Sequence, residues 1–138
     1  MADRKDAIEL WASAARTAGT GTSEWVDIPK DCMGMVFVLD VTAAATDAGD
    51  TLDVEVFTRI GTTTAREICH FTQVLGNGGA LVHIDKILVN TAVATYTYAA
   101  LAAGAKKDIL GSQIQCKYTI VDADADGGFT FSAYALPL

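Results

Sequence analysis

Hydrophobic and polar residues alternate along most of this chain with a period of two. In residues 51–60, for example, Leu52 and Val54 share one face while Asp53 and Glu55 share the other. This alternation is typical of an antiparallel strand with one face in a core and the other toward solvent. No long window keeps the spacing of an amphipathic helix, so the pattern predicts an all-β protein.

About eight strands are expected, and two stretches depart from simple alternation. Residues 33–43 are apolar almost throughout, which suits a strand covered on both faces. Residues 90–107 combine alanines that permit a short helix with a Thr-Tyr-Thr-Tyr run that favours a strand. The expected strands are residues 7–17, 24–28, 33–43, 51–60, 66–75, 81–89, 112–121 and 129–136.

Strict alternation also assigns side chains to the faces of these strands. It places Trp11 on the face opposite Leu10. It places Ile68 and His70 together on one face and Cys69 on the other.

Eight antiparallel strands in 138 residues predict one domain, an antiparallel β-sandwich of jelly-roll type over residues 1–138. A chain of this length buries about two thirds of its unfolded surface, so it needs neither a disulfide nor a metal to hold a core. Residues 1–9 are either an extended N-terminal arm or an ordinary frayed terminus.

The net charge and the lack of a targeting pattern narrow the classes of possible partner. Ten Lys and Arg stand against seventeen Asp and Glu, a net charge of −7. A phosphate backbone rewards clustered positive charge, so we expect no nucleic-acid partner. The first residues alternate charges without the apolar stretch of a secretory signal, and no uninterrupted apolar run suits a membrane span.

The three cysteines predict a protein made in a reducing cytosol. Cys32, Cys69 and Cys116 are widely separated, odd in number and form no CxxC pair. We expect them to be structural, with Cys116 buried as a small hydrophobic residue.

One run has the opening of a calcium-binding loop. In Asp122-Ala-Asp-Ala-Asp-Gly127, alternate carboxylates of Asp122, Asp124 and Asp126 would converge on a cation. The twelfth position is Ala133 instead of a bidentate glutamate, and strand patterns flank the run. We favour an exposed hairpin turn over a weak surface cation site, and we assign no metal ligand.

Catalytic chemistry is not indicated. His70 and His83 are the two histidines, and neither has a second His or Cys three or four residues away to complete a zinc pair. Both are expected to be structural or on the surface. No nucleophile elbow or metalloprotease motif is present, so we expect no enzyme, no catalytic residue and no cofactor.

Aromatic residues leave a binding role open. They stack on sugars in some proteins, but they more often fill a core or a protein interface. A carbohydrate-binding module that uses the three aspartates with calcium is therefore one alternative. The aromatic residues concerned are Trp11, Trp25, Tyr96, Tyr98 and Tyr134.

Five segments in a fixed order carry a resemblance to a known family. They are Val36-Phe-Val-Leu-Asp-Val-Thr-Ala-Ala-Ala45, Thr51-Leu-Asp-Val-Glu-Val56, Phe71-Thr-Gln-Val-Leu-Gly76, Ile114-Gln-Cys-Lys-Tyr-Thr-Ile-Val121 and Phe129-Thr-Phe-Ser-Ala-Tyr134. Over residues 34–138 this order resembles the small jelly-roll structural proteins of tailed bacteriophages, particularly capsid decoration (cement) proteins. Residues 91–107 depart from that pattern and are expected to form a variable contact loop.

The resemblance implies a virion protein, made in the host bacterial cytoplasm, that binds the outer surface of the capsid and clamps neighbouring capsomers. It implies the major capsid protein as partner and a homo-oligomer, with a trimer favoured. Residues 2–15 would then add a strand to a neighbouring subunit. A phage tail, neck or fibre component is the alternative within the virion. No ligand or catalytic site follows from the resemblance.

Overall fold

The computed structural model describes residues 6–60, 64–89, 99–122 and 128–138, which contain ten strands and no helix. The all-β prediction is therefore confirmed. The strands are β1 (Ile8–Arg16), β2 (Gly19–Thr22), β3 (Val26–Asp27), β4 (Gly34–Ala43), β5 (Thr51–Ile60), β6 (Thr64–His70), β7 (Val74–Leu75), β8 (Leu81–Leu88), β9 (Gln113–Val121) and β10 (Phe129–Pro137).

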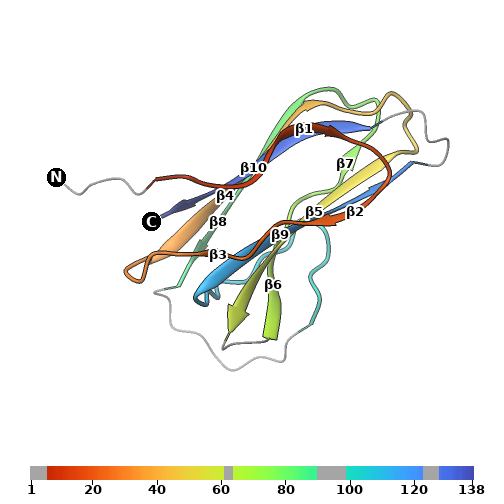
Figure 1. Cartoon of the computed structure of the whole chain (residues 1–138). Helices are drawn as coiled ribbons and strands as arrows, with labels where there is room; N and C mark the ends of the chain where they lie inside the picture. The colour runs from red at the N-terminus through yellow and green to blue at the C-terminus, as the bar shows by residue number, and fades with distance from the viewer. Residues whose placement is uncertain (1–5, 61–63, 90–98, 123–127) are drawn as a thin grey trace.

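Two antiparallel sheets pack together as a β-sandwich (Figure 1). Sheet A has the order β1-β10-β4-β8. Sheet B has the order β2-β9-β5-β6, with β3 paired to β9 and β7 paired to β5. Strands β1 and β8 are thus the edges of sheet A.

The inner faces of both sheets supply one core. On β4, alternate residues point inward, and Phe37 and Leu39 have no exposed surface. Opposite them, sheet B contributes Leu52 and Val54 of β5, each no more than 1% exposed. Period-two alternation produces this arrangement because it turns every second side chain toward the facing sheet.

Six strands lie within one residue of their expected ends, namely β1, β4, β5, β8, β9 and β10. The expected strand over residues 66–75 is divided into β6 and β7, because Phe71 between them turns into the core at 1% exposure. Strand β2 was not expected, since its Gly-Thr-Gly-Thr sequence has no hydrophobic alternation. It pairs with β9 so closely that a Cβ on Gly21 would lie 2.5 Å from the ring of Tyr118.

The predicted faces of β1 are wrong at Trp11. The pairing of β1 with β10 shifts register on both sides of Trp11, and such a bulge rotates the strand. Trp11 therefore packs against the core beside Leu10, with its ring 5.1 Å from that of Tyr118. The guanidinium of Arg16 lies over both of these rings.

The prediction that residues 33–43 are covered on both faces holds for one face. The inner side chains of β4 are buried, whereas Val36 and Val38 on its outer face remain partly exposed. Within the described residues, no segment of this chain forms a layer over that outer face.

Candidate functional site

The outer face of sheet B carries a cluster of ionisable and amide side chains. We call Asp53, Glu55, Glu67, His70 and Gln73 the polar cluster. The first two residues lie on the outward face of β5, and Glu55 pairs in register with His70 of β6. Gln73 follows β6 in the chain and donates a hydrogen bond back to Asp53.

A β-bulge brings Glu67 and His70 to the same face. Residues three apart would lie on opposite faces of a regular strand, but the pairing of β6 with β5 shifts register between Val56 and Phe57. Ile68 and Cys69 consequently both point inward, each with 0% exposed surface. The predicted placement of Ile68 on the face of His70 is wrong for this reason.

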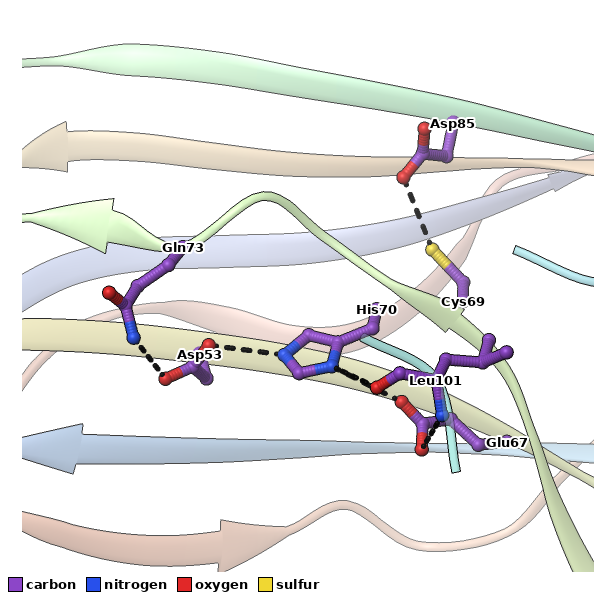
Figure 2. Close-up of polar contacts among 7 residues, drawn as sticks. All are labelled: Asp53, Glu67, Cys69, His70, Gln73, Asp85 and Leu101. Atoms are coloured by element: carbon purple, nitrogen blue, oxygen red, sulfur yellow. Dashed lines mark hydrogen bonds and ion pairs between the residues drawn. The ribbon is translucent and has the colours of Figure 1, made fainter. Parts of the chain in front are cut away.

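His70 is held at both ring nitrogens (Figure 2). Its Nε2 lies 3.1 Å from Oδ1 of Asp53, and its Nδ1 lies 3.0 Å from the carbonyl oxygen of Leu101. Carboxylate and carbonyl oxygens accept hydrogen bonds, so the N–H groups of the ring can point to both Asp53 and Leu101. Gln73 fixes Asp53 in turn, with 2.9 Å between its Nε2 and Oδ2 of Asp53.

Residues 99–107, which we call the cover segment, run beside the edge of β6 and reach its outer face at Leu101. The backbone of His70 bonds Gly104 and Ala105, and the amide of Leu101 donates to Oε2 of Glu67 at 3.3 Å. The side chain of Glu67 is therefore only 3% exposed. The described half of the predicted contact loop is thus bound to this chain's own β6, and residues 90–98 lie outside the described residues.

Burial and like charge change the proton affinities of this cluster. Burial, together with the nearby charge of Glu55, raises the pKa of Glu67 to about 7. Burial lowers the pKa of His70, but its bonds to Leu101 and Asp53 and the charges of the two glutamates outweigh burial, and the net shift is upward. The cluster can therefore bind or release a proton near neutral pH.

The thiols lie apart from this chemistry. Cys69 points between the sheets, and its Sγ donates to Oδ2 of Asp85 at 3.4 Å (Figure 2). Burial, with the charge of Asp85, raises the pKa of Cys69, and burial raises the pKa of Cys116 to about 12. Both thiols stay protonated and neither is a ready nucleophile. The expected burial of Cys116 is confirmed, at 0% exposure.

The described aromatic residues do not form one platform. Trp11 packs against the core, Trp25 lies under the guanidinium of Arg59 at 4.2 Å, and Tyr134 is on the outer face of sheet A. Tyr96 and Tyr98 lie outside the described residues.

Two further candidates from the sequence are His83 and the aspartate run of residues 122–127. His83 is partly buried on the inward face of β8, in register with Leu39. Of the aspartate run, Asp122 follows the end of β9, and Asp124 and Asp126 lie outside the described residues. The exposed hairpin turn favoured from the sequence, and the weak cation site that is its alternative, both stay predictions.

The outer face of sheet A is of the opposite character. We call the apolar side chains of β4, β8 and β10 that line up there the apolar face. Asp40 of β4 and Lys86 of β8 lie on the same side of the sheet, in register with Val82 and Val36. Its most exposed members are Ile84 at 65% and Val82 at 54%. Cross-strand pairing places Val38 beside both Ile84 and Tyr134. The apolar face comprises Val36, Val38, Val82, Ile84, Tyr134 and Leu136.

Strand β8 also leaves part of its backbone open. The carbonyl of Lys86 accepts a bond from Lys106, and the amide of Leu88 donates to Asp108. Even-numbered residues of β8 therefore direct their backbone groups away from β4. In the part of the chain that the structure describes, nothing bonds those groups at Val82 and Ile84.

The fold and these two surfaces define a two-sheet antiparallel β-sandwich with one apolar outer face and one ionisable outer face. Comparisons of this chain with protein-family models, with curated proteins and with solved structures each found no match. Among the described residues there is no helix long and apolar enough to cross a membrane.

Proposed function

We propose that the protein is a virion structural protein that binds the outer surface of a phage capsid and clamps neighbouring capsomers. The observation that carries the proposal is the apolar face beside the open edge of β8. Exposed apolar patches of this kind mark interaction sites on soluble proteins. The occupant is an extended segment of the capsid protein, which adds a strand along β8 and covers the apolar face.

The pairing of the strands supports a jelly roll, the fold shared by many capsid proteins. Strands from the first half of the chain pair with strands from the second half in reverse order, as in a long hairpin. β1 pairs with β10, β2 and β3 with β9, β4 with β8, and β5 with β6 and β7. Rolling that hairpin joins β10 to β4 and β9 to β5, which closes the two sheets.

The chemistry of β8 suits an added strand. Backbone groups at Val82 and Ile84 offer main-chain hydrogen bonds, and the alternate side chains offer apolar contacts. Burying one such side chain completely contributes about 1.5 to 3 kcal/mol. Contacts of that size, repeated around a symmetric shell and within a homotrimer of this protein, add up through avidity.

Charge agrees with a position outside the shell. The net charge of −7 disfavours packaged DNA by like-charge repulsion and keeps an exposed protein soluble. The resemblance of residues 34–138 to decoration proteins points to the same location.

Co-sedimentation with purified undecorated shells tests the proposal, and two valines provide a matched pair. Val82 on β8 and Val121 on β9 are each 54% exposed, but they belong to different sheets. Val82→Lys should weaken saturable shell binding at least tenfold, whereas Val121→Lys should leave it unchanged. Circular dichroism and melting curves confirm that both variants fold.

Wild-type protein that does not sediment with shells, or equal effects of the two substitutions, would overturn the proposal. Binding to purified tails in place of shells would assign the protein to the tail, neck or fibre.

A further inference from the structure

We propose that Glu55, Glu67 and His70 form a binding site for a divalent transition-metal ion, and that Zn²⁺ fits it best. The three side chains come from adjacent strands of sheet B, and each offers one ligand atom. All of these atoms lie within 4.8 Å of one another. The site is separate from the apolar face, so its test does not depend on capsid binding.

The spacing of the donor atoms matches a small ion. Nδ1 of His70 lies 3.4 Å from Oε1 of Glu67. Two ligands of a tetrahedral Zn²⁺, each about 2.0 to 2.1 Å from the metal, are separated by roughly 3.3 to 3.4 Å. The two side chains therefore already stand at the separation of neighbouring zinc ligands.

A further carboxylate fixes the histidine in the orientation that a metal ligand requires. Metal-bound histidines usually donate their other ring N–H to a carboxylate, which holds the ring and sets its tautomer. Here Nε2 donates to Asp53, and Gln73 secures Asp53 from the far side. The proposed metal-binding nitrogen is Nδ1, which faces Oε1 of Glu67 and also the carbonyl oxygen of Leu101 (Figure 2).

The charge of the site favours a cation. Three carboxylates, those of Asp53, Glu55 and Glu67, surround a single imidazole. Glu67 is 97% buried by its own strand and the cover segment, since its side chain is only 3% exposed. Lys117, which pairs in register with Glu55 on β9, is the basic residue facing the cluster from that strand. A divalent ion would relieve the repulsion between Glu55 and the buried Glu67.

The donor set selects the kind of ion. An imidazole nitrogen with carboxylate oxygens suits Zn²⁺ and its neighbours, whereas Ca²⁺ and Mg²⁺ prefer oxygen ligands alone. In the structure, the Nδ1 proton of His70 bonds the carbonyl of Leu101 at 3.0 Å. An ion at Nδ1 takes the place of that proton, and the Leu101 carbonyl must then turn aside or ligate the ion. Binding therefore releases a proton to solvent.

Calorimetric titration of ZnCl₂ into chelator-treated protein at neutral pH tests the site. A Cys32→Ser background removes the one cysteine that is not fully buried, because a thiol would compete for zinc. We expect one Zn²⁺ per chain. Glu67→Gln and His70→Asn should each weaken binding at least tenfold, and Ca²⁺ should not compete. Asp53→Asn should weaken binding about 10- to 100-fold, the usual effect of losing such a supporting carboxylate.

His83→Asn is the matched control, since it removes the other histidine and should leave zinc affinity unchanged. Glu55→Gln repeats the test at a more exposed ligand, in case a change at Glu67 disturbs folding. Co²⁺ in place of Zn²⁺ should give the visible absorption of a tetrahedral site in wild-type protein, and His70→Asn should abolish it. Zinc affinity that is the same in wild-type, Glu55→Gln and His70→Asn proteins would refute the zinc site. The three residues would then form only an internal ion-pair network.

Discussion

The two outer faces of this sandwich differ in what they expose and in what covers them. Sheet A leaves Val82 and Ile84 more than half exposed beside an open strand edge. Sheet B instead buries Glu67 under the cover segment. Exposed apolar side chains add nothing to the stability of the chain that carries them, and buried charges reduce it. Folding alone does not require the exposed side chains of sheet A, for which we propose a protein partner. On sheet B, Glu67 accepts a bond from Leu101 and faces His70, and we propose that a cation joins them.

A substitution in the core that both sheets share should destabilise both outer faces together. Phe131 of β10 has 0% exposed surface, and its ring packs against that of Tyr118 across the sandwich. Phe131→Ala should lower the free energy of unfolding by about 3 to 5 kcal/mol, through lost burial and a residual cavity. Urea denaturation measures the loss. A loss below about 1 kcal/mol would mean that the sheets do not share this core.

A change of pH should alter the stability of the protein through the polar cluster of sheet B and not through sheet A. Glu67 has its pKa raised from 4.5 to about 7, so between these values the folded state binds more protons than the unfolded state. Stability therefore falls as pH rises through that window. The raised pKa of His70 has the same sign: its contribution is present below pH 6.5 and is lost as pH rises through the folded value.

In chelator, we expect the free energy of unfolding to drop by about 1 to 3 kcal/mol between about pH 5 and pH 8, at about 1.4 kcal/mol per unit of pKa shift. The groups facing Glu67 and His70 are Asp53, Glu55, Lys117 and the Leu101 backbone. Glu67→Gln should shrink the drop. Glu9→Gln, which changes a glutamate on sheet A, should not. An equal drop in both variants would show that the polar cluster does not cause it.

Alternation along the sequence was enough to predict most of the sandwich, because a strand between a core and solvent requires it. It could not reveal β2, whose Gly-Thr-Gly-Thr sequence pairs through its backbone and carries no apolar signal. Nor could it show that Trp11 turns inward, since a bulge adds a residue without leaving a mark in the hydrophobic pattern.

The polar cluster was missed for the same reason. Glu67 and His70 are three residues apart, so strict alternation separates them, and only the bulge in β6 unites them. The paired outward carboxylates Asp53 and Glu55 were visible in the sequence, but their neighbour across the sheet depends on register. The apolar run of residues 33–43 predicted a strand covered on both faces, and the described chain covers one of them.

The smallest effect on stability should come from the apolar face. Ile84 is 65% exposed, so Ile84→Thr should change the free energy of unfolding by less than about 0.5 kcal/mol. The same substitution should weaken shell binding severalfold, because it removes apolar area from the interface. Denaturation and co-sedimentation, run on one preparation, separate the two effects. A stability loss above about 1.5 kcal/mol would place Ile84 in the fold instead of at an interface.

Hydrogen–deuterium exchange of shell-bound protein tests the central claim most directly, because it compares both sheets in one experiment. The account predicts that exchange slows in Leu81–Leu88 on binding, as the open amides of β8 gain partners, while Thr64–His70 exchanges as in the free protein. Protection of Thr64–His70 with none at Leu81–Leu88 would contradict the account and move the interface to sheet B.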